Sequence, residues 1–253
     1  MRRIFFLCPM VCLLFLTSGC GLDKYYLLPS PVNINHLAVY TSNYGERYFE
    51  FFTNESDFDS AGDFRFSGTE VYYKIYSSSQ TLESQVAVLN NLAGSDSTSA
   101  TAASRLMTST SSGGYGYRPL RVQNFLSQPT LIPFTGDNQR VYIRLSDYQS
   151  GEDFSARILV NGLPLYGSSS RTIPVRNIPG SHTFNFGREG GNRSRDMPES
   201  TDDDVHYTSM SDGQKWFVAL FAVASGMDVT YTPYYSNILY LGAVTIDADT
   251  QDN

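Results

Sequence analysis

Histidine and aspartate side chains that are close in sequence can together bind a divalent metal ion. His206 follows the acidic run from Asp202 to Asp204, and carboxylate oxygens with an imidazole nitrogen form such a site in many proteins. The run lacks the glycine turn of a calcium loop, and neither His36 nor His182 stands at metal-ligand spacing from His206. The sequence therefore favours a solvated acidic loop and predicts no metal ion and no cofactor.

Signals for catalysis are weaker still. The chain has no Gly-x-Ser-x-Gly motif, and the glycine-rich stretch 187–191 lacks the strand-to-helix context of a phosphate loop. Glu50 with Glu70, or Asp147 with Asp153, would suit glycoside hydrolysis if the fold brought either pair together. Because no motif points to a reaction, the sequence favours a protein that is not an enzyme.

Tyrosine gives the clearest signal for binding. The chain has 18 Tyr and 16 Phe but a single Trp. Five tyrosines lie in or beside segments that contain Gly or Pro, namely Tyr115, Tyr117, Tyr231, Tyr234 and Tyr235. Tyrosine offers a large contact area and a polar tip at low entropic cost, so these residues are candidates for binding a protein or glycan ligand. The alternative is that they simply occupy strand faces.

The N-terminus carries an export signal. Arg2 and Arg3 precede an apolar run of 13 residues from Ile4 to Leu16, whereas a membrane-spanning helix needs about 20. Cys8 and Cys12 lie in this signal, and Cys20 follows it. After removal of the signal, Cys20 is the only cysteine, so no intramolecular disulfide can form.

The stretch Thr17-Ser18-Gly19-Cys20 resembles a bacterial lipobox, with the looser pattern of spirochaetal lipoproteins because Thr17 stands where Leu is usual. The resemblance implies that residues 1–19 are a lipoprotein signal peptide and that acyl chains on Cys20 anchor the protein in a membrane. The alternative is an ordinary secretory signal. Gly21, rather than Asp, follows Cys20, which by resemblance to enteric lipoproteins favours the outer over the inner membrane.

The composition of the mature chain limits its partners. Of the 18 basic residues only Arg2 and Arg3 leave with the signal, so 16 basic residues face 25 acidic ones, a net charge of −9. A net-acidic surface disfavours nucleic acid as a partner. The remaining 234 residues suffice for one large domain or two small ones.

Residues 20–32 form a lipidated tether, which ends in Pro29-Ser30-Pro31, and residues 33–247 form the folded domain. Alternating residues predict that Phe49 and Phe51 face the core and that Glu50 faces water. In the same way Val71, Tyr73 and Ile75 form an apolar face, while Glu70, Tyr72, Lys74 and Tyr76 form an amphipathic one. The predicted strands in this half are 33–40, 47–53 and 69–76, with an acidic loop at 54–66.

A change of period predicts two helices within residues 80–108. Leu82, Val86, Leu89 and Leu92 recur at intervals of three and four, and Gly94 would end the first helix. A second helix would turn Ala100, Ala103, Leu106 and Met107 inward. We expect a two-helix hairpin inserted between strands; the alternative is a disordered Ser/Thr linker.

Residues 120–210 form a β-rich insertion that would be either part of the same domain or a subdomain. Asn161-Gly162 and Pro179-Gly180 predict tight turns, and 188–207 is expected to be a long exposed loop. The predicted strands are 120–126, 140–146, 155–161, 171–176, 182–187, 216–224 and 238–246. A polar tail, 248–253, ends the chain.

Two of these strands resemble the fibronectin type III module. The stretch from Gly68 to Ile75 is similar to its third strand, and Trp216 to Val223 is similar to its sixth. The resemblance implies a mainly β, immunoglobulin-like or fibronectin-III-like antiparallel β-sandwich with additional β-hairpins. The chain also resembles uncharacterised treponemal lipoproteins, a resemblance that implies no activity.

Taken together, these features predict a membrane-anchored lipoprotein of the bacterial cell envelope that acts as a non-enzymatic binding or structural module. The alternatives are an envelope enzyme that acts on glycan or peptide and an accessory subunit of an envelope assembly. An enzyme would show a deep cleft with converging carboxylates or a Ser/His pair.

Overall fold

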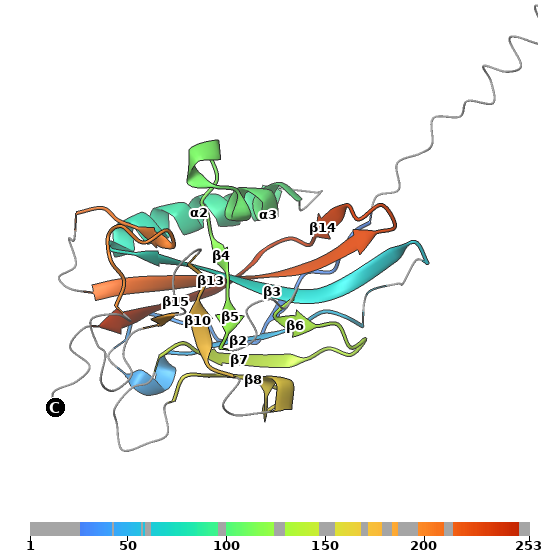
Figure 1. Ribbon diagram of the computed structural model, residues 1–253, viewed down its shortest axis with the longest axis horizontal. Coiled ribbons are helices and arrows are strands. Elements are labelled where there is room, and N and C mark those ends of the chain that lie inside the picture. Colours follow the sequence, from blue (N-terminus) through green and yellow to red (C-terminus); the bar gives the residue numbers. More distant parts are fainter. Residues whose placement is uncertain are drawn as a thin grey trace, which may run out of the picture.

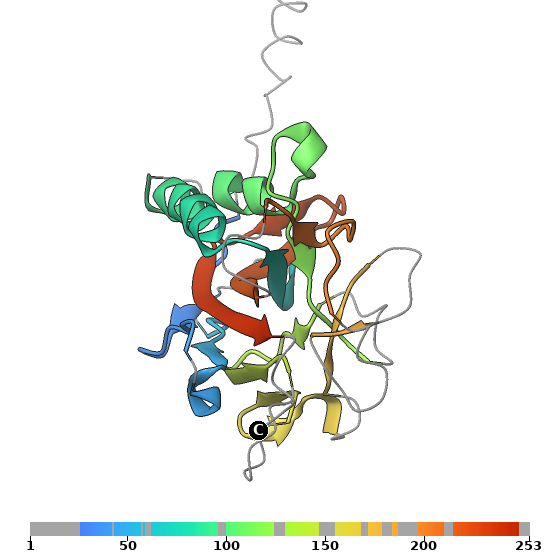
Figure 2. The ribbon, with the colours of Figure 1, turned by 90° about the vertical axis from the view of Figure 1, so that its left-hand side faces the viewer.

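Two β-sheets pack face to face, and a pair of helices covers the outer face of one of them (Figure 1, Figure 2). The chain is therefore mainly β with antiparallel sheets, as the sequence predicts. Cys20, the predicted signal peptide, His182 and the predicted polar tail lie outside the described residues. This computed structural model describes residues 26–41, 43–56, 58, 62–95, 100–123, 130–146, 155–167, 172–178, 184–186, 197–209 and 215–247.

The central sheet is built on two long strands, β3 (Phe64–Tyr76) and β13 (Lys215–Asp228), which pair in antiparallel fashion along their whole length. β15 (Leu239–Asp247) and the short β14 (Pro233–Tyr235) pair with the other edge of β13. Three two-residue strands line the free edge of β3: β6 (Ile132–Pro133), β4 (Arg118–Pro119) and the parallel β12 (Val205–His206).

The second sheet has five antiparallel strands in the order β1-β2-β7-β8-β9. Their bounds are Val32–Asn33, Phe49–Phe52, Arg140–Arg144, Arg157–Val160 and Leu163–Pro164. A small third sheet joins β11 (Phe184–Asn185), β10 (Pro174–Arg176) and β5 (Arg121–Val122). Short 3-10 helices lie at Tyr44–Glu46, Thr110–Ser112 and Leu165–Gly167. The 120–210 stretch thus adds β7 and β8 to the sheet of β2 and supplies the three strands of the small sheet.

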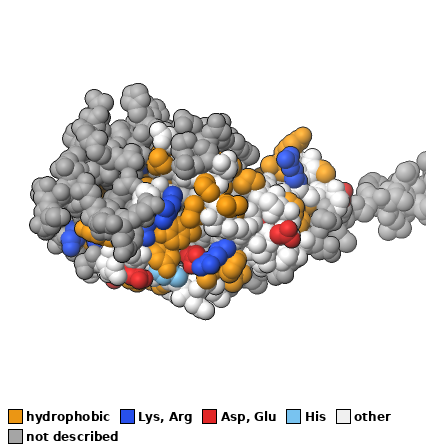
Figure 3. Space-filling model, turned by 90° about the horizontal axis from the view of Figure 1, so that it is seen from below, with side chains coloured by type: hydrophobic (Ala, Val, Ile, Leu, Met, Phe, Trp, Pro, Cys, Tyr) orange, Lys and Arg blue, Asp and Glu red, His pale blue; other side chains and the backbone are white. Residues whose placement is uncertain are grey.

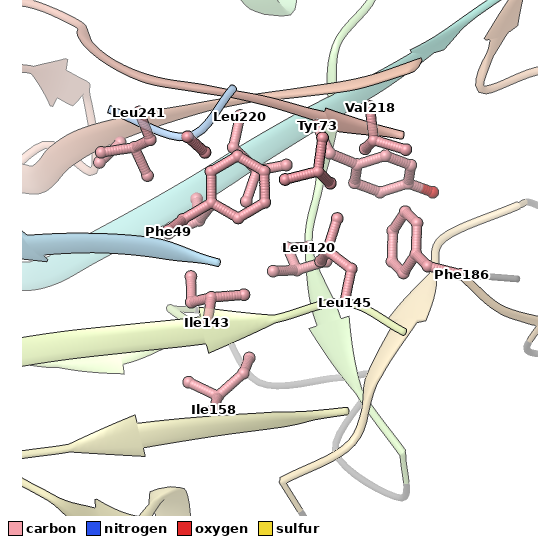
Figure 4. Close-up of a cluster of buried hydrophobic side chains, with 14 of the residues drawn as sticks. Phe49, Tyr73, Leu120, Ile143, Leu145, Ile158, Phe186, Val218, Leu220 and Leu241 are labelled. Atoms are coloured by element: carbon pink, nitrogen blue, oxygen red, sulfur yellow. The ribbon is translucent and has the colours of Figure 1, made fainter. Parts of the chain in front are cut away.

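The main core fills the space between the two large sheets (Figure 4). Phe49 and Phe51 of β2 face Val71, Tyr73 and Ile75 of β3, and all five are fully buried. The alternation predicted for both strands is therefore confirmed. Glu50 does point to the other side of β2, but it is also buried, because its carboxylate accepts a hydrogen bond from Arg140 Nε at 2.7 Å.

The two-helix hairpin predicted within residues 80–108 is confirmed. α2 (Ser79–Ser95) and α3 (Ala100–Met107) lie on the outer face of the β3–β13–β15 sheet. Leu82, Leu89 and Leu106 are fully buried against the aromatic side chains of that face. Gly94 does not end the first helix, which continues through Ser95.

The helices also correct the prediction for the second face of β3. Glu70, Tyr72, Lys74 and Tyr76 are all buried, at 8% exposure or less. Both faces of β3 are therefore covered, although one of them carries polar and charged side chains. The buried charges of that face need partners, either within the protein or on a ligand.

Two other predicted boundaries are wrong. The strand expected at 33–40 ends at Asn33, because Asn35 adopts a positive φ of 58° and turns the chain away. Ala38 then bridges to Gly242 of β15, where a Cβ on Gly242 would lie 2.3 Å from the Ala38 carbonyl oxygen. The acidic loop ends before Phe64, where β3 already begins.

The Asn161-Gly162 turn is confirmed. Both residues have positive φ values, 52° and 79°, and they join β8 to β9 in a hairpin. Pro179-Gly180 lies outside the described residues.

Candidate functional site

A cleft of about 900 Å³ opens beside the end of β3. One wall is the segment that leaves α3, and the other is the segment that leads through β12. Polar side chains dominate its lining, which consists of Lys74, Met107, Ser109, Thr110, Gly116, Tyr117, Arg118, Pro119, Ser200, Asp203, Val205, His206 and Tyr207.

The first wall is fixed by hydrogen bonds to the end of α3. The amides of Tyr115, Gly116 and Tyr117 donate to the carbonyls of Arg105, Thr108 and Leu106, which would otherwise lack partners at a helix end. Gly116 has a φ of +63°, and a Cβ there would lie 3.9 Å from Lys74 Nζ. The positive φ favours glycine at this position, whereas the contact of a Cβ with Lys74 would be an ordinary van der Waals one.

The second wall is held by a buried ion network. Arg176 Nη2 donates to Asp204 Oδ1 at 2.5 Å and to Asp202 Oδ2 at 2.6 Å, and its Nε donates to Asp204 Oδ2 at 2.8 Å. Tyr73 of the core also donates its hydroxyl hydrogen to Asp204, at 2.7 Å. Arg176 and Asp204 are essentially inaccessible to solvent, so this network fastens the acidic run to β3.

This network corrects two expectations. The run 202–204 is not a solvated loop, because Asp204 is completely buried and Asp202 pairs with Arg176. The part of 188–207 that the structure describes also contains β12, which pairs with Ile75 and Tyr76. Within the described residues, no three His, Cys, Asp or Glu side chains lie close enough to hold a metal ion.

Lys74 is the principal charged group at the base of the cleft. Its side chain is buried, with only 3% of the residue exposed, and its ammonium donates a hydrogen bond to the Tyr115 carbonyl. The ammonium also lies 6.0 Å from the centre of the Tyr76 ring. Burial, and secondarily the positive charge of Arg118, lower the pKa of Lys74 to about 8.

No carboxylate among the described residues forms an ion pair with Lys74. Asp203 lines the same cleft, but its carboxylate pairs with Arg118 at 3.4 Å and is largely exposed. Two of the three ammonium hydrogens thus have no acceptor in the described part of the chain. A buried cation with so little compensation favours an anionic partner from outside.

The other polar groups of the cleft are suited to a ligand with hydroxyl groups. Burial and the charge of Lys74 lower the pKa of His206, so its imidazole is neutral at neutral pH. Tyr117 contributes a buried ring, and its hydroxyl lies 3.0 Å from that of Tyr76. Tyr207 is 49% exposed at the rim of the cleft.

The five predicted binding tyrosines do not form one surface. Tyr117 lines the cleft, and Tyr115 supplies the carbonyl that accepts from Lys74. Tyr231, Tyr234 and Tyr235 instead lie at the opposite end of β13, in and beside the turn to β14. Lys74 and Arg118 were missed, because nothing in the sequence around them distinguishes a buried cation from a solvated one.

The fold does not bring together Glu50 and Glu70, the pair considered for glycoside hydrolysis. Glu50 of the second sheet pairs with Arg140, whereas Glu70 of the central sheet accepts from Arg121 Nη1 at 3.0 Å and from the Leu131 amide. Burial raises the pKa of Glu70 to about 7 despite these bonds. Asp147, Asp153 and the 187–191 stretch lie outside the described residues.

A second polar surface lies on the outer face of the five-stranded sheet. The rings of His36, Tyr48 and Tyr142 stack in a row, with centroids 3.9 and 5.0 Å apart. Figure 3 shows hydrophobic side chains beside basic and acidic ones on the underside of the molecule. The His36 ring stacks on Tyr48 and its Nε2 lies 2.9 Å from the Tyr48 carbonyl oxygen, so its polar atoms are already engaged within the protein. The cleft is therefore the stronger candidate site.

Comparison with protein-family models, with curated proteins and with solved structures gave no match to this chain. In the part of the chain that the structure describes, no helix has the length and apolar character needed to cross a bilayer. The function is therefore inferred from the geometry of the cleft and from the N-terminal sequence.

Proposed function

We propose that this protein is a non-enzymatic binding module of a bacterial cell envelope. Acyl chains on Cys20 anchor it in a membrane, and the outer membrane is favoured over the inner one. Its ligand carries an acidic group that Lys74 recognises in the cleft. The export signal and the stretch Thr17-Ser18-Gly19-Cys20 support the anchor. The cleft supports the binding role.

The observation that carries the binding role is the buried ammonium of Lys74 without a carboxylate partner among the described residues. A ligand carboxylate at this position would accept hydrogen bonds from the remaining N–H groups of the ammonium and replace the solvation that Lys74 loses on burial. A hydrogen bond between charged groups contributes about 1.5–3 kcal/mol, which corresponds to roughly 10- to 100-fold in affinity.

An acidic sugar is the ligand class that best fits the rest of the lining. Ser109, Thr110 and Ser200 bring hydroxyl groups to the cleft, and Tyr207 offers an exposed ring at its rim. The volume falls within the usual range for small-ligand sites. A uronic acid combines one carboxylate with several hydroxyls and so matches both features.

The proposed fold is a fibronectin-III-like or immunoglobulin-like sandwich with insertions. The strand pairing supports it: β3, β13 and β15 lie in one sheet, whereas β1, β2 and β7 lie in the other. This is the division expected if β3 and β13 correspond to the third and sixth strands of that module. The helices, the β8–β9 hairpin and the small sheet are then additions to it.

Calorimetric titration of the mature chain, with Cys20→Ser to keep it in solution, tests the proposal. Galacturonate oligosaccharides should bind and the corresponding neutral galactose oligosaccharides should not. Lys74→Met should lower the affinity at least 10-fold, whereas Lys215→Met, which removes an exposed lysine, should leave it unchanged. Equal binding of neutral and acidic sugars, or full affinity in Lys74→Met, would overturn it.

The lowered pKa of Lys74 also favours a second candidate, an envelope enzyme that uses this amine as a nucleophile. Its neutral amine would attack a carbonyl carbon of a sugar or peptide aldehyde, and loss of water would leave an imine. Borohydride in the presence of a reducing sugar should then add the sugar mass to Lys74 and not to Lys215. Equal labelling of both lysines would exclude this candidate.

A further inference from the structure

The turn between β13 and β14 is held rigid by a single carboxylate. Asp228 Oδ1 accepts hydrogen bonds from the Thr230 amide at 2.8 Å, the Thr230 hydroxyl at 2.7 Å and the Thr232 amide at 2.9 Å. The Val229 amide donates to Asp63 at 3.2 Å, which ties the turn to the start of β3. The loop is therefore preorganised.

What this rigid turn exposes is apolar. Val229 is 69% exposed and Tyr231 is 82% exposed. Tyr231 also has a φ of +64°, a conformation that bulky residues rarely adopt. The side chains of Val229 and Tyr231 do not contribute to the core. The ordered turn therefore presents two apolar groups at the protein surface.

The N-terminal chain enters the domain beside this turn. The Tyr26 ring packs 4.6 Å from the Phe64 ring and 5.4 Å from the Tyr234 ring, and Leu28 is buried in the same cluster. Leu27, between Tyr26 and Leu28 in the chain, is 68% exposed. We call Leu27, Val229 and Tyr231 the tip face, because the N-terminal segment packs on Phe64 and Tyr234 and the Val229 amide binds Asp63. Figure 1 shows β14 at the end of the central sheet where the N-terminal segment enters.

Only six peptide steps separate Cys20 from Tyr26. Because a fully extended residue spans at most about 3.5 Å, the tip lies within about 20 Å of an anchor at Cys20. We propose that the tip face docks into the lipid interface and orients the domain on the membrane. This inference rests on the lipid anchor of the proposed function.

The chemistry of the tip face selects a lipid surface rather than a charged partner. Tyrosine and aliphatic side chains are the groups that settle at the membrane–water interface. The charged residues described around the tip are Asp63, Arg65 and Asp228, two acids and one base. We therefore expect docking through apolar contact, without a requirement for anionic lipids.

Docking of this end would direct the cleft away from the membrane. Lys74 lies ten residues beyond Phe64 on β3, about 33 Å along an extended strand. The cleft would then be open to ligands in the aqueous space rather than lie against lipid headgroups.

Depth-dependent fluorescence quenching tests the proposal on the full lipidated chain in phosphatidylcholine vesicles. Acylation blocks Cys20, so Val229→Cys and, as a control near the cleft, Thr201→Cys each give a single labelling site. Brominated lipid should quench the label at 229 several-fold more than the label at 201. Adding phosphatidylglycerol should not change the ratio.

Second-site changes check that the tip itself causes the quenching. Tyr231→Ser should reduce quenching at position 229, whereas Leu163→Ser, which removes a 69% exposed leucine from the β8–β9 hairpin, should not. Equal quenching at 229 and 201 in a chain that floats with vesicles would overturn the tip proposal alone. A chain that does not float would overturn the anchor and the tip proposal together.

Discussion

Arg176 and Lys74 are both buried cations near β12, but they lie on opposite faces of β3. Arg176 reaches Asp204 on the side of Tyr73 and the main core, where two carboxylates surround it. Lys74 lies on the helix side, where its ammonium donates to the Tyr115 carbonyl and forms no ion pair with a described carboxylate, and burial lowers its pKa to about 8. A compensated charge of the first kind holds a fold together, whereas the second kind is typical of a site that awaits a partner.

Removal of the compensated cation should have the largest effect. Arg176→Met leaves Asp204 buried without its counter-charge, and loss of one partner of a buried ion pair costs about 3–5 kcal/mol. Urea unfolding should show this loss. Arg118→Met, which breaks an exposed pair with Asp203, should cost less than about 1 kcal/mol. Similar losses in both variants would contradict the distinction.

Removal of the uncompensated cation should have the opposite effect on stability. Lys74→Met deletes a desolvated charge and keeps the aliphatic stem, so the free energy of unfolding at pH 7 should stay the same or rise by about 1–3 kcal/mol. The same unfolding experiment measures it, with Lys215→Met as the exposed control. A destabilisation as large as that of Arg176→Met would mean that Lys74 has a structural role.

The pH dependence of stability provides a third test. The pKa of Lys74 is about 8 in the folded protein against 10.5 for the free side chain. Between pH 8 and pH 10.5 Lys74 is protonated in the unfolded chain and largely neutral in the folded chain. The free energy of unfolding therefore rises with pH over this range. The unfolding free energy of the wild type should therefore increase relative to Lys74→Met from pH 8 to 10. A constant difference would contradict the lowered pKa.

Glu70 is an intermediate case between the two cations. It has a cationic partner, Arg121, yet its pKa is raised from 4.5 to about 7, mainly by burial. Its contribution to stability is complete below pH 4.5 and is lost as the pH rises through 7. Relative to Glu70→Gln, the wild type should lose about 2–3 kcal/mol between pH 5 and pH 8. An unchanged difference over this range would show that Arg121 compensates Glu70 fully.

Local patterns in the sequence were sufficient for much of the fold. The alternation around Phe49, Phe51 and Tyr73 and the spacing of Leu82, Val86 and Leu89 identified buried faces, because periodicity reports burial directly. The helical pair and the Asn161-Gly162 turn followed from equally local signals. Those signals did not show that the helices would cover the second face of β3.

The cleft could not be predicted in the same way. β12 has only two residues and pairs in parallel with a strand 130 positions earlier in the chain. Arg176 and Asp204 are 28 residues apart. Because the partner of the acidic run lies this far away in the chain, a solvated loop was the expected structure. Lys74 stands in a strand whose other residues gave no indication that its charge would be buried.

The most direct test of the central claim is the titration of Lys74 itself. The chain has three lysines, Lys24, Lys74 and Lys215, so selective ¹³Cε-lysine labelling gives three NMR signals, and Lys74→Met assigns the relevant one. We expect this signal to titrate near pH 8 in the free protein and at a higher pH with bound galacturonate oligosaccharide, because a carboxylate stabilises the ammonium. Titration near pH 10.5 with no response to the sugar would contradict the account.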